Sequence, residues 1–477
     1  MAFSSISPAE GPGRQYPPKV PEGGKADVVV PVPVRDVVVP VPVRDVVVPV
    51  PVREKGKRTV RLLICAGGTG GGVYPALAVL QTMQDKAEVL WVGGEGGMEA
   101  RLVERAKVPF KTIPVAGVHG VGLKTLPGNV FRLVRGFFAA RRILYEFKPE
   151  VLFFTGGYVA VPMALAGRLA GRVPTALYVP DIEPALALKT LARFADKIAV
   201  TAQDSFRYFP PGDSPGSSTG KRRLVLTGYP TRAELASWVV PVPARGWTRS
   251  DARRTLNLTS DAPVLLVVGG SKGARSINNA VLANLSALLE QAQVIHITGE
   301  LDWPTVQARL RGSPGSSTGR GSPGSSTGKE LSDAQAARYH AFPYLHEEMG
   351  AALAAADLAL SRAGASTLGE YPLFGLPAVL VPYPYAWRYQ KVNADTLVRH
   401  GAALMVTDSN LKAELLPTIK ELLQNPTRLS AMRAAAKSLS HPQAATEIGH
   451  LLLELAGELP RSAALRRNAH PKKKRSK

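Results

Sequence analysis

The sequence predicts an α/β protein built from two doubly wound domains that face a common cleft. Two observations support this fold class: short apolar runs end repeatedly in glycine-rich turns, and the series starts a second time in the second half of the chain. Apolar runs that alternate with helical stretches are typical of parallel sheets covered by helices on both faces. Two such series predict two sheets with a ligand gripped between them.

The first series begins with a predicted strand at Val60–Ala66, which runs into the glycine loop 67–72. We expect a helix to start at Pro75 and to continue through Met83, because proline is favoured in the first turn of a helix. Further strands are expected at Val89–Val92, Val151–Phe154, Thr175–Val179 and Lys197–Thr201.

The second series begins with a predicted strand at Val264–Val268, which runs into the glycine loop 269–273. Its other strands are expected at Val294–Thr298, Leu358–Leu360 and Ala378–Val381. The second glycine loop therefore follows its strand as the first one does.

Two low-complexity repeats interrupt the predicted pattern of strands and helices. VVVPVPVR occurs three times between Val28 and Arg53, and its alternate prolines disfavour a stable sheet. SPGSSTG occurs at 214–220, 313–319 and 322–328 and is expected to form flexible insertions. We predict a disordered linker over 1–57, domains over 58–229 and 230–456, and a disordered basic tail over 457–477.

The cysteine content and the lengths of the apolar stretches argue against disulfide-linked, zinc-binding and membrane-spanning proteins. Cys65 is the only cysteine in 477 residues, which excludes an internal disulfide and a cysteine-based zinc site. The longest uncharged stretches, Val151–Gly167 and Tyr371–Trp387, contain glycine and proline and are shorter than the roughly 20 apolar residues of a spanning helix. We expect no transmembrane helix, and the polar N-terminus lacks an export-signal pattern.

The net charge of +22 predicts anionic partners. Eight basic residues lie within 461–477, which contains no acidic residue. This tail is interpreted first as a solvated segment, with an anionic-lipid contact and a nucleic-acid patch as alternatives. We expect phosphate-bearing or membrane partners and no nucleic acid.

The glycine loop 67–72 lies between a strand and a helix, where backbone amides can approach a phosphate or another polar ligand. It is not the dinucleotide fingerprint, because Val73 occupies the position of the third glycine. A tight turn without a ligand is the structural alternative.

Farther along, the turn 362–369 contains small residues and precedes Glu370. A carboxylate behind such a turn can accept hydrogen bonds from both hydroxyls of a ribose, although a capping or surface glutamate fits the spacing too. Gln390 and Asn393 are uncharged groups suited to sugar hydroxyls.

Seven segments occur in the order found in one enzyme family. They are GGTGGGVYPALAV (67–79), GGYVAVPMALA (156–166), GYPTR (228–232), VVGGSKGARSINN (267–279), SRAGASTLGE (361–370), GLPAVLVPYP (375–384) and the Gln390–Asn393 pair. Together they resemble glycosyltransferase family 28, and in particular its lipid-linked N-acetylglucosaminyltransferases of peptidoglycan synthesis, over residues 58–456. The resemblance implies the GT-B fold, a C-terminal domain that binds UDP-N-acetylglucosamine, and an N-terminal domain that receives a polyprenyl-pyrophosphate-linked acceptor. It also implies inversion of the anomeric centre with no metal ion and no other cofactor.

The resemblance assigns donor-side roles position by position. Glu370 matches the ribose-binding carboxylate, Ser271 the residue at the diphosphate, and Arg232 the arginine of the family's N-P-V-R-like segment. A helix N-terminus with Ser271, aided by Arg232, can stabilise the charge that develops on the leaving UDP.

Other donor-side positions match less completely. His346 falls where a backbone amide of the family meets the uracil. Gln390 matches the second of two glutamines near the sugar, and Tyr389 stands where the first would be. With Asn393, these residues complete the predicted donor site.

Two departures from the family pattern fall on the acceptor side. Gly72 stands where the family usually has a histidine, and Tyr178–Asp181 stands where it usually has H-E-Q-N. Activation of the acceptor hydroxyl calls for a general base. Asp181, Glu183 and His119 are the remaining candidates on acceptor-side loops, and each also fits an ordinary loop residue. The predicted acceptor-side glycine loops comprise Gly68, Thr69, Gly70, Gly71, Gly72, Gly156, Gly157 and Tyr158.

The segment 131–142 interleaves large apolar residues with four arginines. It predicts docking on an anionic membrane surface, or else a core-facing amphipathic helix with a solvated basic edge. We interpret the chain as a peripheral enzyme at the cytoplasmic face of the cell membrane that makes lipid II from lipid I. A family 28 enzyme with a different lipid acceptor and a non-catalytic protein that binds a sugar nucleotide or anionic lipid are the alternatives.

Overall fold

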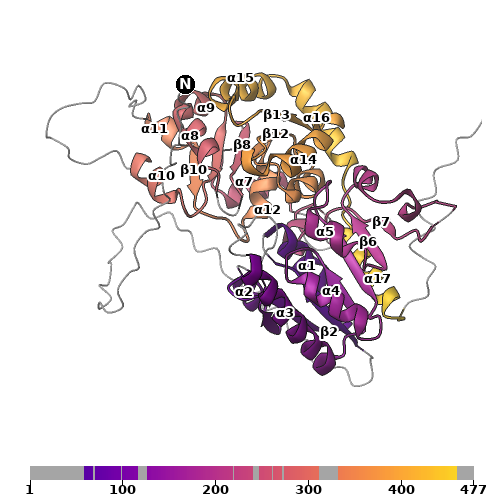
Figure 1. The fold of residues 1–477 in the computed structure, drawn as a ribbon. Coiled ribbons are helices and arrows are strands. Elements are labelled where there is room, and N and C mark those ends of the chain that lie inside the picture. The colour runs from indigo at the N-terminus through magenta and orange to yellow at the C-terminus, as the bar shows by residue number, and fades with distance from the viewer. Residues whose placement is uncertain are drawn as a thin grey trace, which may run out of the picture. The chain divides into compact units, whose positions relative to one another are not determined.

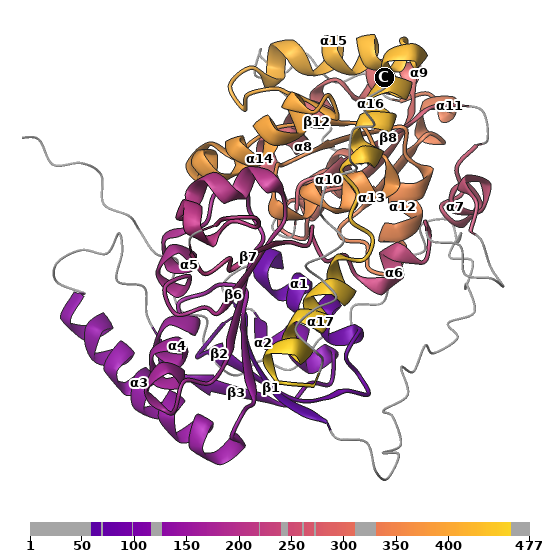
Figure 2. The same ribbon diagram turned by 90° about the vertical axis from the view of Figure 1, so that its right-hand side faces the viewer.

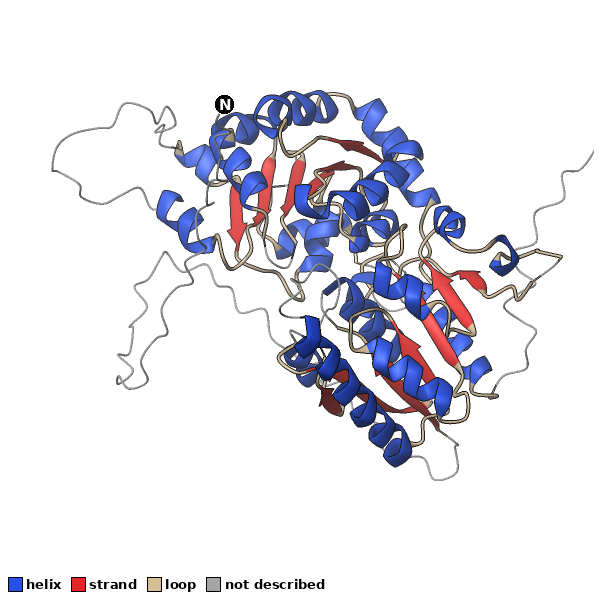
Figure 3. Ribbon diagram, viewed as in Figure 1, coloured by secondary structure: helices blue, strands red, loops and turns tan. Residues whose placement is uncertain are grey.

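Two parallel sheets, each flanked by helices, form the described part of the chain, and they confirm the predicted fold class (Figures 1 and 3). The structure, a computed structural model, describes residues 59–67, 70–97, 99–115, 126–218, 220–239, 247–259, 262–270, 273–310 and 331–458. The predicted linker and nearly all of the predicted tail lie outside these residues.

The first sheet has the strand order β3-β2-β1-β4-β5-β6-β7. Its strands are β1 (Val60–Cys65), β2 (Ala87–Gly94), β3 (Phe110–Ile113), β4 (Val151–Phe154), β5 (Thr175–Val179), β6 (Lys197–Val200) and β7 (Leu224–Leu226). The segments between them form α1 (Gly70–Gln81), α2 (Glu99–Arg105), α3 (Leu126–Phe147), α4 (Ala160–Leu169), α5 (Leu186–Leu191), η1 (Gln203–Tyr208) and η2 (Pro211–Asp213).

The second sheet has the strand order β10-β9-β8-β11-β12-β13. Its strands are β8 (Val264–Val268), β9 (Gln293–Ile297), β10 (Tyr339–Phe342), β11 (Leu358–Ser361), β12 (Ala378–Leu380) and β13 (Ala403–Met405). Its helices include α6 (Ala233–Ala236), α7 (Arg249–Thr255), α8 (Arg275–Ala283), α9 (Leu285–Gln291), α10 (Trp303–Leu310), α11 (Asp333–Ala336) and α12 (Met349–Ala355). The chain continues with η3 (Ala365–Leu368), α13 (Glu370–Phe374), η4 (Pro384–Ala386), α14 (Trp387–Arg399), α15 (Leu411–Leu423), α16 (Pro426–Ser438) and α17 (Ala444–Leu455).

Each sheet is buried on both faces, which explains why its central strands are apolar without alternation. In β1, Leu63 and Cys65 pack toward α3, α4 and α5, whereas Leu62 and Ile64 pack toward α1 and α17. Cys65 is buried, as expected for a small apolar residue.

The last described helix packs on the first sheet rather than the second. Ile448, Leu451 and Leu452 of α17 share a core cluster with β1 and α1, and Figure 2 shows α17 beside α1. By packing, α17 therefore accompanies the first sheet, although it lies within the range 230–456 predicted for the second domain.

The strand orders place a topological switch point between β1 and β4 and another between β8 and β11. Ligands of open α/β sheets bind outside the carboxyl ends of the strands at such points. The glycine loops that follow β1 and β8 lie there.

The start of α1 differs from the prediction. The helix begins at Gly70 and not at Pro75, which lies inside it. A proline this early removes only one helical hydrogen bond, and the three glycines before Val73 put no side chain in the way of a first turn.

None of the described helices is long and apolar enough to cross a membrane.

Candidate functional site

The first glycine loop meets the turn after β4 at the carboxyl edge of the first sheet. The hydroxyl of Thr155 donates a hydrogen bond of 2.7 Å to the carbonyl of Gly72. Gly157 has φ +87°, and a Cβ added to it would lie 3.0 Å from the carbonyl oxygen of Gly67, so glycine is needed there. The structure thus brings the two predicted acceptor-side loops together. Gly68 and Thr69 lie outside the described residues.

Gly72, the position of the family's histidine, is buried against Thr155. A Cβ added to Gly72 would lie 3.2 Å from Thr155 Oγ1 and 3.4 Å from its carbonyl oxygen. A larger side chain would require Thr155 to move, so the departure from the family pattern is accommodated by the packing. Tyr158, at the end of the same turn, is half exposed.

A glutamate that was not predicted supports the first loop. Glu99 is buried, and its carboxylate accepts a hydrogen bond of 2.9 Å from the backbone nitrogen of Gly94. A Cβ added to Gly67 would lie only 2.6 Å from Glu99 Oε1, so the carboxylate fills space that a side chain would need. The sequence signal was the glycine pairs just before this acidic residue.

The second glycine loop turns tightly after β8. Gly270 and Gly273 have φ +85° and +74°, and the backbone nitrogen of Gly273 donates to the carbonyl of Gly270 at 2.9 Å. Ser271, predicted at the diphosphate, lies outside the described residues, so its role stays a prediction.

Arg362, from the turn 362–369, contacts α8, the helix that follows the loop 269–273. Arg362 Nη2 donates to the hydroxyl of Ser276 on α8 at 2.7 Å, and Nη1 pairs with Asp408. The guanidinium also lies 5.3 Å from the centre of the Tyr383 ring. These contacts fix the start of α8 against the end of β11.

Glu370 lies at the start of α13, beside the segment that joins the two halves. Burial raises the pKa of its carboxyl above the ordinary value, and the Arg232 guanidinium partly offsets the rise. The pKa of the buried Tyr229 hydroxyl is raised by burial first, and then by the carboxyl groups of Glu370 and Asp181. One predicted donor residue and one predicted base therefore lie around the same tyrosine.

A row of aromatic and cationic groups lines the same region. The guanidinium of Arg232 lies 5.0 Å from the centre of the Tyr74 ring, and the hydroxyls of Tyr74 and Tyr344 are 3.0 Å apart. The ring of Tyr344 lies 4.5 Å from that of His346. Nη1 of Arg105 is 3.2 Å from His346 Nδ1, and burial and this arginine lower the pKa of the imidazole. Residues of α1 and α2 thus meet the loop that was predicted to contact the uracil.

Asn393 joins the two halves through hydrogen bonds. Its Nδ2 donates to Asp181 Oδ1 at 2.8 Å and to the carbonyl of Ala363 at 3.2 Å, and its Oδ1 accepts from the backbone nitrogen of Ile182 at 3.0 Å. The side chain is fully buried, so both of its amide hydrogens are used within the protein. Its predicted contact with the donor sugar is untested.

Gln390 forms a hydrogen bond with a residue seven positions before it in the sequence. Its Oε1 accepts a hydrogen bond of 2.9 Å from the backbone nitrogen of Tyr383. This bond ties α14 to the turn after β12 and leaves the predicted sugar contact of Gln390 open.

The three candidate bases have different surroundings. Burial raises the pKa of Asp181, and the hydrogen bond from Asn393 partly offsets the rise. Glu183 is buried, and Lys189 Nζ lies 3.2 Å from its Oε1. His119 lies outside the described residues. Of the two described candidates, Asp181 is the one whose carboxyl group raises the pKa of Tyr229.

No group of three or more His, Cys, Asp or Glu side chains in the described ranges is arranged to hold a metal ion.

Comparison with known proteins gives the family. The glycosyltransferase family 28 N-terminal domain matches residues 62–200, and the family 28 C-terminal domain matches residues 264–448. Curated relatives from Roseiflexus sp. (strain RS-1) and Desulforudis audaxviator are 39% and 35% identical, over 82% and 84% of this chain and 94% and 99% of their own. Both are named UDP-N-acetylglucosamine--N-acetylmuramyl-(pentapeptide) pyrophosphoryl-undecaprenol N-acetylglucosamine transferase.

A solved structure agrees with the sequence comparisons. The crystal structure of Acinetobacter baumannii MurG superposes with a TM-score of 0.60 and 26% identity, and the match covers 83% of this chain and 100% of that one. The chain therefore belongs to glycosyltransferase family 28 and is a glycosyltransferase with the GT-B fold.

Proposed function

We propose that this chain transfers N-acetylglucosamine from UDP-N-acetylglucosamine to undecaprenyl-pyrophosphoryl-N-acetylmuramoyl-pentapeptide, which converts lipid I into lipid II in peptidoglycan synthesis. The 39% identity to the Roseiflexus relative over 82% of this chain carries the proposal, because the name of that relative states this donor and acceptor. The site supports it, since a carboxyl group from each half of the chain lies near Tyr229.

The proposed donor site uses residues of the second half. Glu370 accepts hydrogen bonds from the ribose hydroxyls, and Gln390 faces the sugar. Asn393 contributes indirectly, because its hydrogen bonds hold Asp181 and the backbone of Ile182 in place. Ser271 and the backbone of loop 269–273 bind the diphosphate, with Arg232 beside it, and the backbone at His346 meets the uracil. Fixed positive charge at the diphosphate stabilises the UDP that leaves. We therefore propose that transfer needs no metal ion or other cofactor.

The proposed chemical step uses Asp181 as the general base. The acceptor hydroxyl oxygen attacks the anomeric carbon as the bond from that carbon to UDP breaks, and UDP keeps the bonding electron pair. The hydroxyl proton passes to the Asp181 carboxylate. Burial raises the pKa of this carboxyl, which makes its ionised form a stronger base. Attack from the face opposite UDP inverts the anomeric centre.

The membrane side of the proposal rests on α3. Phe131, Val134, Phe138 and Tyr145 are among its exposed residues, although the opposite face of the helix packs into the core. The same helix exposes the arginines at positions 132, 135, 141 and 142. An amphipathic helix of this composition binds anionic lipid at the interface. We propose that α3 docks the enzyme peripherally on the cytoplasmic face of the cell membrane.

One observation favours a second candidate, a family 28 transferase with another lipid acceptor. Gly72 and Asp181 replace the usual acceptor-side residues of the family, and Gly72 is packed against Thr155.

An acceptor panel tests the proposal. Purified full chain is mixed with UDP-N-acetylglucosamine and either lipid I or polyprenyl-pyrophosphate-linked sugars that lack the muramoyl peptide. We expect transfer to lipid I and at least tenfold slower transfer to the others. Faster transfer to another acceptor would select the second candidate, and UDP binding without transfer to any acceptor would remove both.

A further inference from the structure

A pocket lies at the edge of the first sheet opposite the glycine loops. Its walls come from residues at the amino ends of β5, β6 and β7, from α4 and from the end of α17. It consists of two adjoining hollows of about 130 and 280 Å³, both lined by Arg168, Phe194 and Asp196. Because β5 spans five residues, this amino-edge pocket lies roughly 13 Å from the carboxyl edge of the sheet.

One cation of the pocket, Arg223, has all of its side-chain nitrogens hydrogen-bonded within the protein. Nε and Nη2 of Arg223 donate to the two carboxylate oxygens of Asp213 at 2.8 and 2.6 Å. Its Nη1 donates to the carbonyls of Ala192 and Ala195 at 2.7 and 2.9 Å. Arg223 therefore builds the wall and has little capacity left for a ligand.

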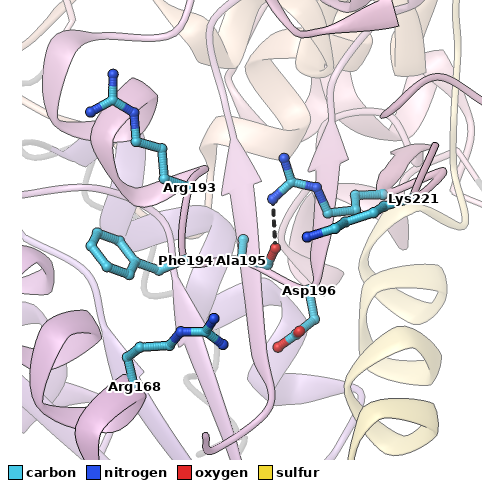
Figure 4. Close-up of a pocket in the computed structure, with 7 residues that line it drawn as sticks. Arg168, Arg193, Phe194, Ala195, Asp196 and Lys221 are labelled. Atoms are coloured by element: carbon cyan, nitrogen blue, oxygen red, sulfur yellow. Dashed lines mark hydrogen bonds between the residues drawn. The ribbon is translucent and has the colours of Figure 1, made fainter. Parts of the chain in front are cut away.

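Four other cations of the pocket have no such hydrogen bonds with the described residues. The side chains of Arg168, Arg172, Arg193 and Lys221 form no hydrogen bond or ion pair with the described residues, and all four are exposed. In Figure 4, Arg168 and Lys221 extend toward the middle of the pocket from two sides, and Arg193 extends away from it. Positive charge around the hollow therefore exceeds what its one lining carboxylate, Asp196, can offset.

Asp196 is the one carboxylate that lines the pocket, and it faces four cations that have no ion-pair partner among the described residues. Asp196 Oδ2 accepts a hydrogen bond of 2.9 Å from the backbone nitrogen of Thr175. Several cationic side chains around a hollow larger than a water molecule favour a compact polyanion. Guanidinium groups offer paired donors that match the oxygens of a phosphate.

Exposed leucines lie next to the pocket and further basic residues follow it in the sequence, so a phosphate bound there can belong to a lipid headgroup or be a soluble ion. Leu165 and Leu169, on the helix that carries Arg168, are 42% and 65% exposed. Leu455 lines the pocket, and the eight basic residues of 461–477 follow it closely in the chain.

We propose that the amino-edge pocket binds a phosphate group, through Arg168, Arg172 and Lys221. The group belongs either to the headgroup of an anionic phospholipid or to a soluble phosphate. The site is separate from the cleft that holds the proposed donor, and it does not depend on the proposed function.

The test compares two triple variants of the full chain. The pocket variant carries Arg168→Gln, Arg172→Gln and Lys221→Gln, and the control carries Lys86→Gln, Arg101→Gln and Lys107→Gln. The control positions are exposed cations of the first half that form no ion pair with the described residues, so both variants lose the same charge. Arg168→Gln alone serves as a milder second variant, and thermal unfolding confirms that each protein is folded.

Two measurements separate the sources of the phosphate. Inorganic phosphate is titrated by calorimetry into protein whose cleft is saturated with UDP, at constant ionic strength. Binding to phosphatidylcholine vesicles with and without phosphatidylglycerol is measured by sedimentation. We expect the pocket variant to bind at least tenfold more weakly than the wild type in one or both measurements, and the control to change by less than about twofold.

The pattern of loss identifies the ligand. A loss with vesicles alone assigns the site to a lipid headgroup, and a loss with inorganic phosphate assigns it to a soluble phosphate. Equal losses in the two triple variants would show a general charge effect, and no loss in the pocket variant would show no site; either result overturns the proposal.

Discussion

Two partly buried carboxyl groups near Tyr229, those of Glu370 and Asp181, differ in the groups that offset their charge. Glu370 has the guanidinium of Arg232 near it, whereas the hydrogen-bond partner of Asp181 is the neutral amide of Asn393. A cation stabilises a carboxylate more strongly than an amide does. Glu370 is therefore suited to remain ionised and bind hydroxyls, and Asp181 is suited to take up a proton.

Replacing Glu370 by alanine should weaken UDP binding by about 1–3 kcal/mol, because the ribose hydroxyls lose their charged acceptor. Calorimetric titration with UDP measures the change. Glu290→Ala, an exposed glutamate on α9, is the control and should bind UDP as the wild type does. Unchanged affinity in the Glu370 variant would reject the donor assignment.

Replacing the base by its amide should reduce turnover by roughly 10²–10⁴-fold, while UDP affinity barely changes. We expect this result for Asp181→Asn and a smaller effect for Glu183→Gln, because Glu183 is paired with Lys189. The amide at position 181 can still accept the hydrogen bond from Asn393, so the loss reports proton transfer more than packing. Near-normal turnover in both variants would move the role to His119 or to a water-mediated route.

For individual residues, the sequence predicted which side chains belong to the site better than it predicted what those side chains contact. Glu370 and Asp181 were selected because their motifs and loops marked them. The sequence analysis did not select Tyr74, Tyr229 or Glu99. Nothing in the local sequence distinguishes a tyrosine or glutamate of the site from others, because their partners come from distant parts of the chain. Asn393 was selected for a sugar, and its bond to Asp181 spans positions 212 residues apart, which no local pattern shows.

At the scale of elements, the predicted strands are the ones in the middle of each sheet. The four that the sequence analysis missed, β3, β7, β10 and β13, are the edge strands of the two sheets. Two of these edge strands, β7 and β13, are only three residues long and too short to stand out as apolar runs. The other two contain polar residues, Lys111 and Thr112 in β3 and His340 in β10, and in β10 no residue is fully buried. A continuous apolar run predicts a central strand and fails at the edges.

A buried polar network stiffens the start of the second half. Nε2 of His296 on β9 donates to Asn278 Oδ1 at 3.0 Å, and its Nδ1 accepts from the Tyr339 hydroxyl at 2.7 Å. Asn278 Nδ2 donates to Asp302 at 3.0 Å. The network links α8, β9 and β10, and burial lowers the pKa of His296 to about 4.

This histidine should make the protein less stable in acid. Its pKa is near 6.5 in the unfolded chain and about 4 in the folded one, so the unfolded chain binds more protons between these values. Stability is complete above pH 6.5 and falls as the pH drops toward 4, by up to about 3 kcal/mol. Urea unfolding of wild type and His296→Gln across this range measures the difference. A parallel pH dependence in the two proteins would contradict the assignment.

At the scale of the whole molecule, the chain returns to its first sheet at the end. The segment before α17 passes Gly228, where a Cβ would collide with the side chain of His441. Ile448 and Leu452 of α17 are fully buried and Leu451 nearly so. The first sheet is therefore completed by a helix that follows the whole second sheet in the sequence.

Ending the chain after Ser440 should prevent stable folding. Each buried Ile or Leu contributes about 1.5–3 kcal/mol, and losing several of them removes much of the roughly 5–15 kcal/mol by which a domain is stable. Ending it after Glu458 removes only the basic tail and should leave the Tm within a few degrees of the full chain. Scanning calorimetry of both truncations gives the comparison. Equal Tm values for the two would show that α17 is dispensable.

Metal-independent, inverting transfer to lipid I can be measured as the formation of lipid II in the presence of excess EDTA. Full chain is incubated with UDP-N-acetylglucosamine and lipid I, and the initial rate and the anomeric configuration of the new linkage are measured by NMR. We expect a β-linked N-acetylglucosamine on lipid I and the same rate with and without the chelator. Release of UDP without a lipid-linked product, retention of the α configuration, or loss of turnover in EDTA would contradict it.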